Sequence, residues 1–384
     1  MDNKSRLFGL DILRATAILI VIFTHSYYYL HLKPVNYLAK IVPDGVTLFF
    51  VLSGFLIGNI ILKYVNDNSF PFKRLTNFWI RRWFRTLPAY FVVISLLFAF
   101  QFCMGEFKNG AEHLKYYFFI QSITDGEARL YGESWSLCVE EWFYLLVPFA
   151  LFVSMGLKLF RKQQIFLFWI FLIIILVTLI RSYRVQFCEN VADWDRFSRK
   201  ALITRLDSIM YGLFGAYLSY YNHPIWKKKN TLFIIGILLL FINISHSFIF
   251  GYGFFTKYFS LTVQSLSTLL LLPKLRSMKA FPGRIPRIIT FISMISYSMY
   301  LLNGTPFHEF VLRGLKAAGL PDDAFFWCDL IRFVAFVIWA FLGSWLLYKF
   351  VEVPMLKLRD YIYPEVKKQQ PVSKTSEIPY IVSK

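Results

Sequence analysis

The stretch that decides the fold is LDILRATAILIVIFTH, residues 10–25, an apolar run that carries Asp11, Arg14 and His25. A charged side chain inside a bilayer costs about 2.5–3.5 kcal/mol on insertion scales, so it usually faces a protein interior or a wet cavity. Arg14 and His25 are separated by three helical turns plus roughly 20°, which puts both on one helix face. Asp11, one turn before Arg14, is placed to pair with it. The stretch predicts a membrane helix with a functional face; the alternative is a histidine that only ties two helices together.

The composition extends this interpretation to the whole chain. Of 384 residues, 57% are hydrophobic and 20% are aromatic, more than a water-soluble domain needs. A helical span needs roughly 20 apolar residues, and the chain offers about ten such runs. They lie near residues 8–28, 44–63, 84–104, 137–155, 164–181, 204–221, 231–250, 257–273, 288–304 and 328–350. We therefore predict an all-α polytopic membrane protein.

The basic residues predict the orientation. Cytoplasmic loops of membrane proteins are enriched in Lys and Arg, and most of the basic residues here fall in loops that are cytoplasmic if both termini are inside. The net charge of +19 then reflects topology and contact with lipid headgroups, and we expect no nucleic-acid partner. We predict one transmembrane domain over residues 1–364 and a polar, disordered cytoplasmic tail over residues 365–384. The oligomeric state is left open.

A cluster of arginines lies in FWIRRWFRTLPAY, at the predicted cytoplasmic start of the third span. Arg81, Arg82 and Arg85 are spaced three and four apart, so Arg85 shares a helix face with each of the others. Guanidinium groups beside the positive end of a helix dipole suit a phosphate or pyrophosphate. The alternative is ordinary anchoring by positive charge on the inner side.

Two adjacent acids lie in SWSLCVEEWFYLLVP, where the fourth span begins on the outer side. Neighbouring helix positions diverge by about 100°, so at most one of Glu140 and Glu141 points into the cleft that His25 lines. A carboxylate beside an imidazole orients it, as in hydrolytic triads. The alternative is a structural ion pair with Arg205 or Arg332.

Small residues indicate where helices approach closely. Gly54 and Gly58 in the second span, and Gly212 and Gly215 in the sixth, have spacings of four and three that permit close helix contact. The four cysteines show no spacing typical of a metal site, and we expect no metal. Burial as small hydrophobic thiols explains them better than disulfides do.

Together these segments resemble the membrane-bound acyltransferase family 3, whose bacterial members esterify surface or secreted glycans. The family's Arg-and-His pattern in the first helix corresponds to Arg14 and His25, and its RxxR element to Arg82 and Arg85. Its LFFVLSGFLI, WS..VEE.FYL..P and SYSLYLLH segments correspond to residues 48–57, 135–148 and 296–303, within a resemblance that covers residues 6–355.

The resemblance implies an O-acyltransferase of the bacterial cytoplasmic membrane. Acetyl-CoA, the favoured acyl donor and co-substrate, would bind its phosphates near the arginine cluster, with Arg14 along the route of the pantetheine arm. His25 would act as general base or as covalent carrier; we favour the base, with Glu140 or Glu141 orienting it. The acceptor would be a hydroxyl of a surface or lipid-linked glycan.

Candidate acceptor residues lie mainly in the outer segment ENVADWDRFSRK. Trp194 offers a stacking surface, although an interfacial tryptophan is a common alternative. Asp193 and Asp195 offer hydroxyl contacts, and Asp207 and Asn303 complete the candidate set.

Departures from the family pattern matter. The family often has Asp at Thr47, Gln at Trp142 and His at Asn303. Asparagine cannot relay a proton at neutral pH, which argues against a two-histidine scheme. Many relatives carry a C-terminal SGNH esterase-like domain; we identify none here and expect direct transfer from the membrane domain.

Two other functions stay open. A transporter or flippase of a lipid-linked sugar also has about ten spans, intramembrane charges and a central cleft. A one-sided arginine cluster and the lack of an inverted repeat argue against it. An acyltransferase that acts on a small intracellular metabolite keeps the chemistry and changes the acceptor.

Overall fold

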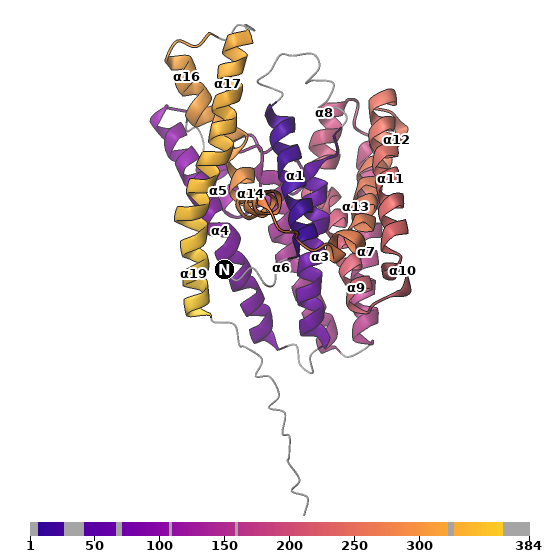
Figure 1. Cartoon of the computed structure of the whole chain (residues 1–384). Helices are drawn as coiled ribbons and strands as arrows, with labels where there is room; N and C mark the ends of the chain where they lie inside the picture. Colours follow the sequence, from indigo (N-terminus) through magenta and orange to yellow (C-terminus); the bar gives the residue numbers. More distant parts are fainter. Residues whose placement is uncertain are drawn as a thin grey trace, which may run out of the picture.

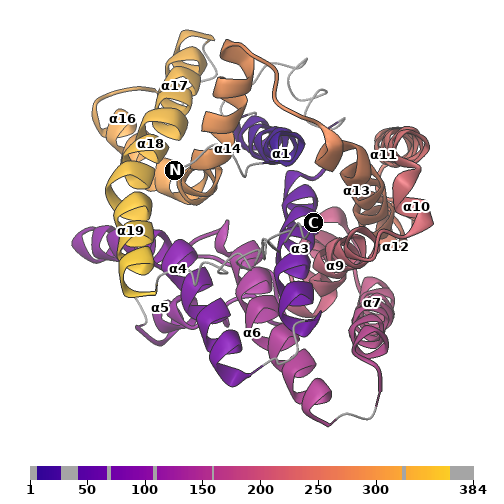
Figure 2. The ribbon, with the colours of Figure 1, turned by 60° about the horizontal axis from the view of Figure 1, so that its bottom comes forward.

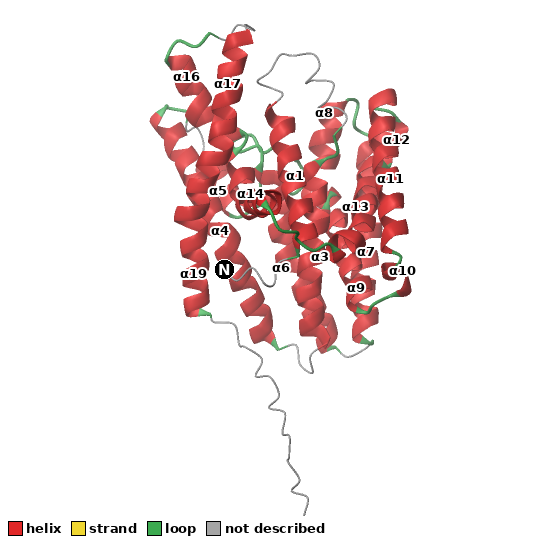
Figure 3. Cartoon of the chain, in the orientation of Figure 1, coloured by secondary structure: helices red, strands yellow, loops and turns green. Residues whose placement is uncertain are grey.

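The computed structural model describes residues 7–26, 42–66, 71–106, 110–157, 160–321 and 326–363, and every regular element within them is helical (Figure 3). The long helices are α1 (Phe8–Ser26), α3 (Gly45–Asn66), α4 (Phe72–Cys103), α6 (Ser134–Gly156), α7 (Lys162–Val185), α9 (Leu206–Tyr220), α11 (Lys229–Phe250), α13 (Ser260–Ser277), α14 (Arg284–Leu302) and α17 (Phe326–Ile338). The last continues through η6 (Trp339–Gly343), α18 (Ser344–Leu347) and η7 (Tyr348–Glu352) into α19 (Val353–Ile362). The remaining short elements are α5 (Gly110–Tyr117), α8 (Val191–Trp194), η3 (Asp195–Arg199), η4 (Leu202–Thr204), α10 (Pro224–Lys227), α12 (Phe254–Tyr258), α15 (Thr305–Phe307), η5 (His308–Leu312) and α16 (Arg313–Ala317).

The membrane character predicted from the sequence is confirmed. Among the described residues, eight helical runs are long and apolar enough to cross a membrane, with α17 to α19 counted as one run. The predicted sixth and eighth spans correspond to α9 and α13, which fall outside that set. They have 15 and 18 residues, and α13 carries Lys274 and Arg276 in its last turn.

Helix α3 lies at the centre of the bundle, with α1, α6, α9 and α13 packed around it (Figures 1 and 2). In the apolar window of α3, 78% of the residues are buried, against 11% in α11, which therefore presents most of its surface to lipid. Helix α1 packs against α14, and α13 packs against α11. Both α1 and α3 therefore have one side facing the bundle interior, where the site is built.

Glycines set the distance between α3 and α9. A Cβ atom at Gly54 would lie 2.0 Å from the carbonyl oxygen of Ile209, and one at Gly212 would lie 2.0 Å from that of Val51. Only a residue without a side chain permits this approach, so the predicted role of these glycines in packing is confirmed. One turn further along, Gly58 meets the Cβ atom of Ala216.

Helix α4 begins earlier than the sequence analysis predicted, at Phe72 and not near residue 84. Buried Leu75 and Phe78 continue its packed face toward the N-terminus. Arg82 therefore lies ten residues inside the helix, roughly 15 Å from its start. The predicted help from the helix dipole is wrong, because that effect fades within the first turn.

Asp207, a candidate acceptor-binding residue in the sequence analysis, has a structural role. Its carboxylate lies 2.7 Å from a guanidinium nitrogen of Arg181, and the two side chains are 0% and 2% exposed. Arg181 also donates to the carbonyl oxygen of Thr204 at 3.1 Å. This ion pair ties α7 to α9, and the enclosed carboxylate does not reach the cavities described below.

Adding a methyl group at Gly212 should destabilise the protein. The Cβ of Gly212→Ala would overlap the α3 backbone, and overpacking of this kind costs about 1–3 kcal/mol. We expect a lower thermal midpoint in detergent for this variant. Gly156→Ala is the matched control, because a Cβ there meets nothing within 4 Å. Equal midpoints for the two variants would contradict the close crossing.

Replacing Asp207 should also lower the stability of the protein. Asp207→Asn leaves a buried Arg181 charge without its partner, which costs about 3–5 kcal/mol. We expect a lower yield of monodisperse protein and a lower thermal midpoint, whereas Asp193→Asn, on the outer segment, should leave both unchanged. An Asp207→Asn protein of normal stability with only weaker acceptor use would restore the substrate-binding interpretation.

Candidate active site

His25 lies at the end of α1 and meets Asn303, directly after α14. The imidazole Nδ1 and the amide Oδ1 of Asn303 are joined by a short hydrogen bond. The amide Nδ2 of Asn303 donates to the carbonyl oxygens of Met299, at 3.1 Å, and Tyr300, at 2.7 Å. Asn303, predicted as an acceptor-binding residue, is therefore the residue that holds the histidine.

These hydrogen bonds define the tautomer of His25. The amide nitrogen of Asn303 is directed at two carbonyl oxygens, so its oxygen must face the imidazole. An oxygen only accepts, so Nδ1 of His25 must be the protonated nitrogen. In the neutral imidazole, Nε2 then carries the lone pair and is the nitrogen able to take a proton from a hydroxyl.

A cavity of about 770 Å³ opens beside His25, and we call it the histidine cavity. Charged and aromatic side chains line one part of it: Asp44, Glu133, Trp135, Trp194, Asp195, Arg199, Lys200 and Tyr300. Another part is polar and uncharged, with Asn243, Ser247, Thr256, Ser260 and Gln264. The Oδ1 atom of Asn243 is buried and has no hydrogen-bond partner among the described residues. The cavity therefore offers aromatic surface, charges and an unsatisfied acceptor.

The structure brings only part of the predicted outer segment to this cavity. Trp194 and Asp195 line it. The Trp194 indole donates to the carbonyl oxygen of Lys257 at 3.1 Å, which fixes the ring. Asp193 lies outside the lining, and its carboxylate accepts from the backbone of Glu189 at 3.3 Å.

An ion-pair network forms one wall of the histidine cavity. Asp44 lies 3.3 Å from Arg199 and 3.2 Å from Arg205, and Asp195 bridges Arg199 and Lys200. Burial opposes the charged form of Asp44, but the two arginines, together with hydrogen bonds from Thr47 and the Val46 backbone, outweigh it and hold its pKa below the usual value. The same balance lowers the pKa of Asp195, where Arg199 and Lys200 outweigh burial. Both acids therefore stay ionised at neutral pH.

A carboxylate, that of Asp44, lies beside Thr47. The Thr47 hydroxyl donates to Asp44 at 2.6 Å and accepts from Arg205 at 2.7 Å. Arg205 is therefore paired with Asp44, and Arg332 is paired with Asp329 at 3.1 Å. The sequence alternative, in which Arg205 or Arg332 pairs with one of the α6 acids, is therefore wrong.

A second cavity, of about 430 Å³, lies between α1, α3, α4, α6 and α14, and we call it the basic cavity. Its polar and charged lining residues include Arg14, Ser53, Asn59, Lys63, Arg82, Arg85, Thr86, Glu140 and Ser296. Arg82 lies 3.7 Å from Glu140, and its guanidinium stacks 4.1 Å from the centre of the Tyr144 ring. Arg82 is therefore held in place by α6.

The predicted arginine cluster divides in the structure. Arg85 has an exposed side chain in the basic cavity and no ion pair with another described residue. Arg81 turns away, donates to the carbonyl oxygen of Tyr363 at 3.0 Å and lies 3.5 Å from Asp360. A phosphate in the basic cavity would therefore meet Arg85 and not Arg81.

Neither predicted acid on α6 is placed against His25. Glu140 faces the basic cavity and accepts from the Tyr144 hydroxyl at 2.9 Å. Glu141 is buried and accepts from the hydroxyl of Thr86, which itself lines the basic cavity, at 2.9 Å. The two side chains leave α6 in different directions, as expected for neighbouring helix positions, but both contact residues of α4. Three carboxylates line the histidine cavity with His25: Asp44, Asp195 and Glu133, the last of which lies one residue before α6.

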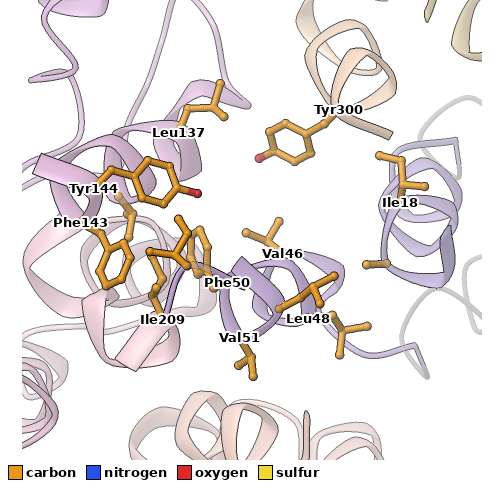
Figure 4. Packing of buried hydrophobic residues seen from close by; sticks show 14 of the residues in the cluster. Ile18, Val46, Leu48, Phe50, Val51, Leu137, Phe143, Tyr144, Ile209 and Tyr300 are labelled. Carbon is orange, nitrogen blue, oxygen red and sulfur yellow. The ribbon is translucent and has the colours of Figure 1, made fainter. Parts of the chain in front are cut away.

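The two cavities meet at Val46 and Tyr300, which line both. The Tyr300 hydroxyl accepts from Ser136 at 2.6 Å and donates to the carbonyl oxygen of Glu133 at 3.0 Å. Figure 4 shows its ring reaching from α14 into the space beside Val46 and Leu137. Arg14 lines only the basic cavity and His25 only the histidine cavity, so one face of α1 serves both.

Several lining residues were not singled out in the sequence: Asp44, Lys63, Glu133, Arg199, Lys200, Asn243 and Tyr300. Asp44 had a signal, since it precedes Thr47 by one turn and offers the missing carboxylate. Tyr300 lies in the segment 296–303, and Arg199 and Lys200 lie in the outer segment, but nothing local identifies them as lining residues, because segments far apart in the chain come together there.

Comparison with known proteins identifies the family of the chain. Residues 7–349 match the family model of the acyltransferase 3 type, described as an acyltransferase domain. A Staphylococcus aureus protein named "Putative O-acetyltransferase" is 27% identical over 91% of this chain, which spans 57% of that relative's length. A Bacillus subtilis protein named "Putative peptidoglycan O-acetyltransferase YrhL" is 34% identical over 40% of this chain and 25% of its own length.

No significant match to a solved structure was found. The family model nevertheless covers α1 through the start of η7, and with it every residue that lines the two cavities. This polytopic membrane chain belongs to the acyltransferase 3 family.

Proposed function

We propose that this protein transfers an acetyl group from acetyl-CoA to a hydroxyl of a surface or lipid-linked glycan, in the bacterial cytoplasmic membrane. The observation that carries the proposal is the pair of cavities that meet at Tyr300, one basic and one containing His25. A charged nucleotide donor and a polyhydroxylated acceptor need different surroundings. The two cavities provide these surroundings on opposite sides of Val46 and Tyr300.

The basic cavity suits the donor. Phosphate groups of CoA are anionic, and guanidinium groups bind them through charge-assisted hydrogen bonds. Within the arginine cluster, Arg85 is exposed in this cavity and has no ion pair among the described residues, and Arg82 is oriented by Glu140. Under the predicted topology this cavity faces the cytoplasm, where acetyl-CoA is made.

The histidine cavity suits a glycan. Trp135 and Trp194 offer apolar ring surface for a sugar face, and Asn243 offers an acceptor to a hydroxyl or amide. The name of the Bacillus subtilis relative, which refers to peptidoglycan, supports an acceptor of this class.

The chemistry follows from the tautomer of His25. The acceptor hydroxyl attacks the thioester carbon, its proton passes to Nε2 of His25, and the C–S bond then breaks to release CoA as the thiolate, which regains the proton. Asn303 keeps Nδ1 protonated and Nε2 available. The thioester and the hydroxyl would meet beside Val46 and Tyr300, which line both cavities.

Replacing Asn303 should lower the rate of acetyl transfer and should leave donor binding unchanged. Asn303→Leu removes the acceptor for the Nδ1 proton, so the imidazole loses its orientation and its tautomer. We expect kcat for transfer of labelled acetyl groups to membrane glycans to fall about 100-fold, as for loss of general-base catalysis, with the KM for acetyl-CoA unchanged.

Asn303→Asp is the matched control, since it retains an acceptor oxygen and should recover part of the rate. His25→Ala should abolish ester formation. Normal transfer by folded His25→Ala protein would contradict the role of His25 as general base. Absence of any labelled ester with the wild type would favour the transporter alternative.

Arg85 and Arg81 form a matched pair for the donor site. Arg85→Met should weaken CoA binding about tenfold, as expected for loss of one charge-assisted contact, measured by calorimetry on protein in nanodiscs. Arg81→Met should leave the affinity unchanged, because its guanidinium lies outside the cavity. Equal losses in the two variants would contradict a phosphate site inside the basic cavity.

A further inference from the structure

We infer that Lys63 binds the 3′-phosphate of the CoA donor at the open end of the basic cavity. This inference rests on the proposed function and adds a donor-binding residue that neither the arginine cluster nor the family motifs contain. It begins from an exposed lysine that lines the same cavity as Arg82 and Arg85.

The charge of Lys63 is available for a ligand. The ammonium group has no ion pair or hydrogen bond to any other residue that the structure describes. A lysine near the end of a span usually reaches the lipid headgroups. Lys63 instead lines a cavity inside the bundle, where a cation lowers the cost of bringing in an anion.

The position of Lys63 along the cavity selects the phosphate. Val46, at the wall between the cavities, and Lys63 are seventeen residues apart on α3, a rise of roughly 26 Å. The cavity is therefore long and narrow, as an extended CoA molecule requires. Its thioester must lie at the Val46 and Tyr300 end, where His25 is closest.

The two cationic positions lie at different depths. Lys63 is three residues before the end of α3, about 4.5 Å along the axis, whereas Arg85 is thirteen residues from the start of α4, roughly 20 Å. These helix ends follow one another in the chain and lie at the same end of the bundle (Figure 1). Arg85 is thus the deeper cation and Lys63 the outer one.

This order matches the order of charges in CoA. From the thiol outward, the pantetheine arm leads to the pyrophosphate, and the 3′-phosphate on the ribose comes last. Arg82 and Arg85 then bind the pyrophosphate, and Lys63 binds the 3′-phosphate. A lysine suits this group because it acts as a compact point charge toward a terminal phosphate.

Two ligands that differ only in this phosphate test the inference. The affinities of CoA and 3′-dephospho-CoA are measured by calorimetry for the wild type, Lys63→Met and Arg85→Met in nanodiscs. We expect the wild type to prefer CoA, and Lys63→Met to weaken CoA about tenfold while leaving 3′-dephospho-CoA unchanged. Arg85→Met should weaken both ligands alike, because both contain the pyrophosphate.

The controls separate the possible failures. Lys73→Met, at an exposed lysine on the first turn of α4 outside the cavity, should change neither affinity. Equal wild-type affinity for the two ligands, or equal losses of both in Lys63→Met, would overturn the assignment of Lys63 and leave the acyl-CoA donor intact. Failure of the wild type to bind either ligand would overturn the proposed donor itself. The wild-type comparison needs no variant, so the test holds even if Lys63→Met folds poorly.

Discussion

The backbone contact between α3 and α9 is the constraint on which the rest of the structure depends. Gly54 and Gly212 let the two helices touch, and any side chain at either position would overlap the facing carbonyl group. With one side of α3 fixed in this way, its other side is free to line cavities. Residues from Asp44 to Lys63 then form a continuous wall that serves first the histidine cavity and then the basic cavity.

The cost of charge in an apolar environment explains how the ionisable residues are distributed. Arg181 and Asp207 neutralise each other in full burial, and Arg205 is paired with Asp44. These groups hold helices together. Arg85 and Lys63 differ, because each is exposed in a cavity and has no ion pair among the described residues. The structure thus separates charges that stabilise the fold from charges that are available to a ligand, a distinction that residue type alone does not make.

The sequence predicted the elements more fully than their partners. Long apolar runs identify the spans, and small residues at helical spacing indicated the α3 and α9 contact. The sequence predicts the start of α4 too late, because the basic residues interrupt the apolar run, whereas Phe78 and its neighbours continue the helix. The sequence predicts that one of Glu140 and Glu141 orients His25, because both lie near the same predicted side of the membrane as the histidine. The structure directs them to Arg82 and Thr86 on α4.

The sequence by itself determined that the chain is a polytopic membrane protein, that Arg14 and His25 share a helix face, and that its motifs are those of one family. Periodicity and hydropathy are local properties, so they can be derived from neighbouring residues. Only the tertiary structure decided that Asn303 holds His25, that Arg81 leaves the cavity and that Lys63 enters it. These outcomes depend on which helices pack together and how each is rotated, which is set by contacts between residues far apart in the chain.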